Sequence, residues 1–314
     1  MYGKYLVLFA ILFTGWFLRK IDFIDDKMNH SMNKLIVYFA YPCLIVHNIG
    51  NLEMSSEVIR NFLITFIICL VAFYAYGLIC KGYARLRHIP EKETGVVEFA
   101  MSAPNDGFMG FPVALIFFGD TGMLLMIAHN AAMNFFAFTY GIALLKKHDG
   151  RNQKFRVRNV TRAALKLLLN PNILALFIGF AFSLAPFGIP DAADEYLTYI
   201  GGVSTPMAMI FIGSTLSECS FKETFKSFIT IEASLMKLVW IPLITLAGVY
   251  FLPVSPIIKS IVVLGGAFPT AATVSMLSEQ EGLDARISSK ILFMSTMVSI
   301  VTVPLIINFL SMIF

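Results

Sequence analysis

Long apolar stretches recur along the whole chain, and only short polar connections separate them. Most of these stretches reach the length of about 20 residues that an α-helix needs to cross a bilayer. The pattern therefore predicts an all-α polytopic membrane protein with ten transmembrane helices and no soluble domain. The predicted spans are residues 2–18, 31–49, 59–80, 94–119, 123–145, 167–186, 198–216, 228–251, 256–278 and 288–313.

Composition agrees with a membrane protein and argues against other classes. Hydrophobic residues make up 57% of the chain and charged residues only 14%, whereas an ordinary soluble domain is about a quarter charged. The cysteines and histidines are scattered, so their spacing predicts neither a metal site nor a cofactor. The sequence has no GxSxG nucleophile motif, and we expect no enzyme. The basic residues are concentrated in particular connections, which does not favour nucleic acid binding.

The placement of positive charge predicts the orientation. Twenty of the 24 lysines and arginines lie in the connections that follow the odd-numbered spans, and only Lys4, Arg60 and Lys259 fall on the opposite side. By the positive-inside rule, the odd connections are cytoplasmic and both termini lie outside the cell membrane. The most basic connection, residues 146–166, either serves topology alone, which we favour, or also binds anionic lipid headgroups.

Prolines repeat at matching places in the two halves of the chain. Pro42 and Pro104, in the second and fourth spans, are 62 residues apart, and Pro206 and Pro269, in the seventh and ninth, are 63 apart. Because each half holds five spans, the second half enters the membrane from the opposite side and the repeats are inverted. The expected parts are a first five-helix repeat at residues 1–145, a basic cytoplasmic linker at 146–166 and a second five-helix repeat at 167–314.

The fourth and ninth spans are poor material for continuous helices. The stretch APNDGFMGFP in the fourth span holds two prolines and two glycines, and GGAFPTAATV in the ninth is similar. A proline inside a helix frees backbone polar groups that lipid cannot satisfy, so such groups must face protein, water or a ligand. We expect half-helices that meet at Asn105-Asp106 and at Ala267-Thr270, with amino ends that favour an anion.

Five motifs, in order along the chain, resemble the auxin efflux carrier family of membrane transporters. They are NDGFMGFP, LLNPNILALFIG, STPMAMIFIGSTL, AFPTAATVSMLSEQEG and STMVSIVTVPL. The resemblance covers essentially the whole chain. It implies ten helices in two inverted repeats, outside termini, a crossing of broken helices 4 and 9, and a homodimer, since family members are often dimeric.

The same resemblance implies the substrate class. Plant members of the family export auxin, and bacterial members are associated with malate, malonate and similar acids, so a small organic anion is expected. The chain looks like a compact prokaryotic member because it lacks the long cytoplasmic insertion of many plant members. It departs from the family at Asp106, where a small or hydroxyl residue is usual.

Polar residues inside the predicted spans form the candidate site. The substrate-binding candidates are Asn105, Asp106, Gly107, Asn130, Asn134, Pro269 and Thr270. Asn130 and Asn134 share a helix face, and they either contact substrate or only bond between helices. Asp106 and Glu98 are the candidates for coupling to a proton or sodium, because a buried carboxylate without a cation tends to be protonated. Lys237 either holds a substrate carboxylate or, as we favour, reaches towards the cytoplasm or pairs with Glu232.

These features predict a secondary carrier that moves a small organic carboxylate by alternating access at the crossing of helices 4 and 9. A sodium-coupled carrier resembling the bile-acid symporters, a channel, and a membrane receptor or sensor are the alternatives.

The charge asymmetry makes the orientation testable. A reporter that is active only outside the cell is expected to be active when fused after Phe314 and inactive when inserted in residues 146–166. The reverse activity pattern would show that the predicted orientation is inverted.

Overall fold

The computed structural model describes residues 2–148, 157–218 and 221–314, and these are helical throughout except for turns and short extended segments. Five helical segments are long and apolar enough to cross a membrane: Ser56–Leu86, Asp106–Lys146, Asp191–Leu216, Phe228–Tyr250 and Arg286–Ile313. Two shorter apolar helices, Pro171–Leu184 and Pro256–Ala267, accompany them. The protein is therefore an all-helical membrane protein.

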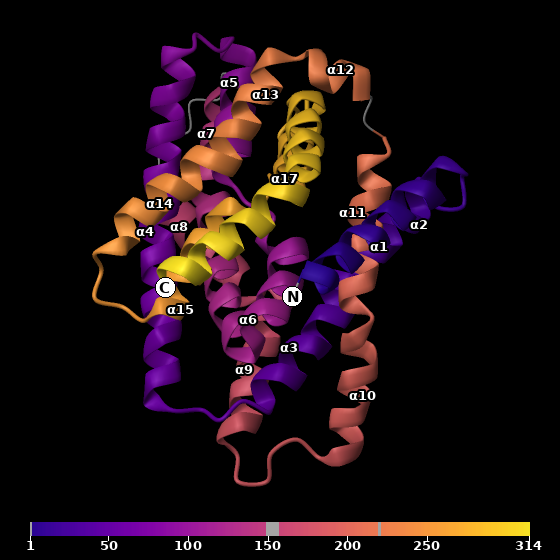
Figure 1. The fold of residues 1–314 in the computed structure, drawn as a ribbon, viewed down its shortest axis with the longest axis vertical. Coiled ribbons are helices and arrows are strands. Elements are labelled where there is room, and N and C mark those ends of the chain that lie inside the picture. Colours follow the sequence, from indigo (N-terminus) through magenta and orange to yellow (C-terminus); the bar gives the residue numbers. More distant parts are fainter. Residues whose placement is uncertain (1, 149–156, 219–220) are drawn as a thin grey trace. The chain divides into compact units, whose positions relative to one another are not determined.

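The chain divides into two compact units, each built from segments of both halves of the sequence (Figure 1). Unit 1 comprises residues 1–62, 111–124 and 165–218, and unit 2 comprises residues 63–110, 125–164 and 219–314. This division differs in kind from the predicted sequence repeats, because a compact unit is defined by packing and a repeat by succession along the chain.

The elements of unit 1 are α1 (Tyr2–Lys20), α2 (Asp26–Leu35), the π-helical turn η1 (Ile36–Ala40), α3 (Tyr41–Gly50), α9 (Pro171–Leu184), α10 (Asp191–Gly202) and α11 (Ser204–Leu216). Those of unit 2 are α5 (Glu91–Ser102), η2 (Asp106–Gly110), η3 (Ala137–Gly141), α7 (Ile142–His148), α12 (Phe221–Lys226), α13 (Phe228–Leu235), η4 (Met236–Trp240), α14 (Ile241–Tyr250), α15 (Pro256–Ala267), α16 (Ala272–Gln280) and α17 (Arg286–Ile313). The chain passes between the units within α4 (Ser56–Leu86), α6 (Phe111–Phe136) and α8 (Val157–Leu168).

Close backbone contact at glycines holds unit 1 together. Helix α1 packs along α11, and a Cβ atom added to Gly213 would lie 1.8 Å from the carbonyl oxygen of Leu12. Gly15 meets the backbone of Ile210 in the same way, at 2.2 Å. Lipid is as apolar as leucine, so packing of this kind, with small residues at the contact, is what holds membrane helices together.

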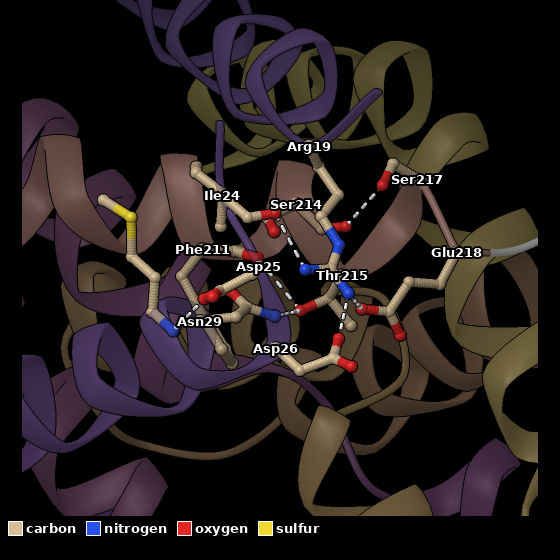
Figure 2. Close-up of polar contacts among 11 residues, drawn as sticks. Arg19, Ile24, Asp25, Asp26, Asn29, Phe211, Ser214, Thr215, Ser217 and Glu218 are labelled. Atoms are coloured by element: carbon tan, nitrogen blue, oxygen red, sulfur yellow. Dashed lines mark hydrogen bonds and ion pairs between the residues drawn. The ribbon is translucent and has the colours of Figure 1, made fainter. Parts of the chain in front are cut away.

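Arg19 ties the end of α1 to α2 and to the end of α11 (Figure 2). Its guanidinium donates to the carbonyl oxygen of Ile24 at 2.8 Å, pairs with Asp26, and reaches Glu218 Oε1 at 3.1 Å. The side chain of Asp25 accepts from the amide of Met28 at 2.6 Å and caps α2. This cap explains why α2 begins at Asp26, before the predicted second span at residue 31.

Three prolines inside the spans coincide with widened helical turns. The turns η1, η2 and η4 each precede a helix that carries proline at its second position, namely Pro42, Pro112 and Pro242. Proline has no amide to donate, and its ring clashes with the carbonyl a turn earlier, so a π-helical turn relieves the crowding. Gly119, with φ of 64°, interrupts α6 where the predicted fourth span ends. The predicted seventh span likewise consists of two helices, α10 and α11, divided at Val203.

Candidate functional site

Two interrupted helices meet in unit 2. Helix α5 ends at Ser102, and a helical conformation resumes at Asp106 in η2; helix α15 ends at Ala267, and α16 begins at Ala272. Between these helices the chain is extended, and Pro104 and Thr270 form an antiparallel β-bridge. The interruptions therefore lie at the two predicted break points, and the extended segments are direct neighbours.

The two extended segments satisfy each other's backbone. The amide of Asn105 donates to the carbonyl oxygen of Pro269 at 2.7 Å, and the amide of Ala271 donates to that of Ala103 at 2.9 Å. Pro104 and Thr270 lie opposite each other between these two bonds, at a position where an antiparallel pair exchanges no bond. Proline therefore fits at residue 104 without loss of a ladder hydrogen bond.

Thr270 uses its remaining polar groups to join further helices. Its amide donates to Ser295 Oγ on α17 at 3.1 Å, and its hydroxyl donates to the carbonyl oxygen of Ala100 on α5 at 2.8 Å. Thr270 is fully buried. The Thr270 side chain thus holds the break between α15 and α16 against the last turn of α5.

Asp106 opens η2, directly after the first break, and is fully buried. Its Oδ2 lies 2.7 Å from His129 Nδ1, and its Oδ1 accepts from Asn130 Nδ2 at 2.7 Å. Asn134 Nδ2 donates in turn to Asn130 Oδ1 at 3.0 Å, which fixes the Asn130 amide with its NH₂ group towards the carboxylate. The predicted residues Asp106, Asn130 and Asn134 thus form one chain of hydrogen bonds, which is buried at Asp106 and Asn130 and partly exposed at Asn134.

His129 belongs to this cluster, although its sequence position did not distinguish it from the other histidines. Its ring packs on the backbone of α15, since a Cβ atom added to Gly265 would lie 2.3 Å from His129 Nε2. On another side it meets the Phe73 ring edge to face, with centroids 5.0 Å apart. Because residue 265 is glycine, the imidazole can contact both the α15 backbone and Asp106. The one sequence signal was adjacency, because His129 directly precedes Asn130.

Lys237, on η4, corrects a prediction. We expected it to reach towards the cytoplasm or to pair with Glu232, but it is fully buried and Nζ donates to the carbonyl oxygen of Gly266 at 3.0 Å. Glu232 instead accepts from Arg87 Nε at 3.1 Å. In a continuous helix the Gly266 carbonyl would accept from residue 270, whose amide is bound to Ser295 here, so Lys237 satisfies an acceptor that the break sets free. A cation also suits the carboxyl end of a helix.

Asn105 and Gly107 differ from the bonded residues around them. Asn105 is 3% exposed, and its side chain makes no hydrogen bond to any residue that the structure describes. A Cβ atom added to Gly107 would meet only Asn130 Nδ2, at 3.5 Å. Glu98 is also buried, on α5 two turns before Asp106. The unbonded amide and the open glycine backbone are therefore the groups best able to contact a ligand.

The cluster offers N–H donors, an ammonium group and a carboxyl–imidazole pair. Within the described part of the chain, no three His, Cys, Asp or Glu side chains are grouped so as to hold a metal ion. The first amides of η2 and α16 have no acceptor within their own helices, as at every helix start. The cluster therefore holds hydrogen-bond donors together with groups that can carry positive charge or exchange a proton.

The Lys237 contact makes a prediction about stability. Lys237→Met leaves the Gly266 carbonyl buried without a donor, which should lower the free energy of unfolding by about 1–3 kcal/mol. Thermal unfolding in detergent measures the change. Lys290→Met is the control, since Lys290 Nζ lies 3.6 Å from Glu223 Oε2 in a solvent-accessible pair, worth at most about 1 kcal/mol. Equal losses in the two variants would contradict a structural role for Lys237.

Comparison with known proteins agrees with a transport site. Residues 1–307 match the family model described as "Membrane transport protein". The chain is 24% identical to an "Uncharacterized transporter" of Methanothermobacter thermautotrophicus, with 94% of each chain covered. It is 26% identical to the "Putative malonate transporter" of Rhizobium meliloti (96% and 93% covered) and 24% identical to the transporter YfdV of Escherichia coli (96% and 95%). The match over nearly the whole chain shows that this protein is a transporter, not an enzyme, and that it belongs to the membrane transport protein family, the family of the auxin efflux carriers.

Proposed function

We propose that this transporter is a secondary carrier that moves a small organic carboxylate across the cell membrane by alternating access. The observation that carries the proposal is the pairing of two helix breaks through Pro104 and Thr270. Interrupted helices at matching places in two inverted repeats are the common mark of a carrier site near the bilayer midplane. In this proposal residues 1–145 and 167–314 are the inverted repeats, residues 146–166 join them in the cytoplasm, and helices 4 and 9 cross at the bridge.

The proposed binding site lies where the half-helices begin. The first amides of η2 and α16, which have no acceptor in their own helix, carry partial positive charge, and this charge favours a carboxylate in place of its lost hydration. Asn105 is the proposed direct contact, with Gly107, Pro269 and Thr270 forming the backbone around it. Asn130 and Asn134 act through Asp106, which they orient. The name of the Rhizobium meliloti relative supports a dicarboxylate such as malonate as the substrate class.

Proton coupling follows from the position of Asp106. An ionised carboxylate at the start of η2 repels a substrate carboxylate at the same helix end, whereas one more proton on the Asp106–His129 pair removes the repulsion. Substrate and proton therefore bind together. A sodium ion is the weaker alternative, because both carboxylate oxygens already face N–H groups or an imidazole nitrogen.

Binding should depend on the side chain of Asn105. Asn105→Ala deletes the one buried amide that has no protein partner in the cluster, and malonate binding is expected to weaken at least tenfold, about 1.4 kcal/mol. Isothermal titration of the purified protein with malonate, malate and the neutral malonic diamide measures the effect. Asn172→Ala on α9 is the matched control. Equal affinities of the two variants, or of acid and diamide, would place the anion site elsewhere.

Coupling should depend on the carboxylate of Asp106. Asp106→Asn keeps the shape of the side chain and removes the carboxyl group proposed to carry the proton, so a pH gradient should no longer drive accumulation while exchange of labelled substrate continues. Uptake into proteoliposomes measures both activities and also separates a carrier from a receptor. Glu98→Gln removes the other buried carboxyl group and should leave gradient-driven accumulation intact. Accumulation by Asp106→Asn at the level of the unsubstituted protein would refute the coupling role.

A further inference from the structure

An apolar groove in unit 2 lies outside the proposed carboxylate site. It encloses about 190 Å³ between η4 with α14, α15 and α17, and Thr302 is the one polar residue in its lining. Leu305 on α17 is 61% exposed, and Leu243 on α14 is 47% exposed. Because exposed leucines on a membrane span face lipid, the groove opens to the bilayer.

A lysine lies one turn beyond one end of the groove. Leu246, Val263 and Leu310 line the groove on three different helices. Four residues further towards that end, about 6 Å along each helix, lie Tyr250 on α14, Lys259 on α15 and the C-terminal Phe314.

These last three residues meet one another. Lys259 Nζ donates to the carbonyl oxygen of Tyr250 at 2.7 Å and lies 5.3 Å from the centroid of the Phe314 ring. The ammonium group of Lys259 therefore lies one turn beyond the groove, next to residues from the two other segments that line it.

The Lys259 ammonium group has unused donors. It has three N–H groups, and the structure gives it one hydrogen-bond acceptor. Among the described residues it forms no ion pair with a carboxylate. Tyr250 and Phe314 flank it, and aromatic residues are typical of the membrane–water interface. An anion at this position would face a cation at headgroup depth.

From this arrangement we propose that the groove binds one acyl chain of an anionic glycerophospholipid, with its phosphate paired to Lys259. The positive charge of Lys259 favours an anionic headgroup, and the apolar lining of the groove favours a hydrocarbon chain. The volume suits a segment of one chain and leaves no room for two, since a cavity of about 150 Å³ holds one benzene molecule. The site is separate from the carboxylate site and does not depend on the proposed transport mechanism.

Fluorescence quenching tests the proposal. The chain has two tryptophans, Trp16 and Trp240, so changing both to Phe and adding Phe309→Trp puts one reporter in the lining of the groove. The protein is reconstituted in phosphatidylcholine vesicles that contain brominated phosphatidylglycerol or brominated phosphatidylcholine. Half-maximal quenching by brominated phosphatidylglycerol is expected at a mole fraction about fivefold lower than by brominated phosphatidylcholine. This is the preference for an anionic lipid that one lysine near the membrane surface gives.

The controls decide between occupants. Lys259→Gln should abolish the preference, whereas Arg60→Gln, which removes another cation predicted on the same side, should preserve it. Equal quenching by the two lipids, or a preference that survives Lys259→Gln, would overturn the proposal. Stronger quenching by a brominated free fatty acid would assign the groove to fatty acids, and absence of quenching by any of them would assign it to a second copy of the chain.

Native mass spectrometry of Lys259→Gln and Arg60→Gln without the tryptophan changes repeats the test, and equal retention of phosphatidylglycerol would refute the proposal.

Discussion

Unpaired backbone groups are too costly to leave in a bilayer, and this requirement governs the centre of unit 2. Each break in a membrane helix exposes several such groups, and lipid offers them no partner. Here the two breaks supply each other, through the bonds of Asn105 to Pro269 and of Ala271 to Ala103. Neither interruption would be stable alone, because its acceptors and donors lie on the other. The site therefore requires both broken helices.

The groups that the β-bridge leaves unsatisfied explain the buried polar residues around it. Lys237 bonds the Gly266 carbonyl, Ser295 accepts from the Thr270 amide, and the Thr270 hydroxyl reaches Ala100. These contacts connect η4, α17 and α5 to the breaks. A movement that changes the exposure of the break must therefore move several helices together, as the proposed alternating access requires.

Local chemistry predicted some of these features and could not predict others. Pro104 and Pro269 located the breaks, because the effect of proline on a helix acts within one turn. The pairing of Pro104 with Thr270 joins residues 166 positions apart and depends on how the helices pack. For Lys237 the sequence showed depth in a span but not the carbonyl that a distant break would expose, so the interpretation in terms of Glu232 was wrong. Asp106 stood out by its charge, whereas its partner His129 was identified from the contact between η2 and α6 in the structure.

Two adjacent glycines, Gly265 and Gly266, connect the Asp106–His129 cluster with the Lys237 contact at the break. The first has no side chain, so that the His129 ring can lie on the α15 backbone, and the second offers its carbonyl oxygen to Lys237. The last turn of α15 thus contacts both the His129 imidazole and the Lys237 ammonium group. A shift of that turn would alter the surroundings of both titratable groups at once. The proposed proton coupling could therefore act on helix movement through these backbone contacts, without a direct bond between His129 and Lys237.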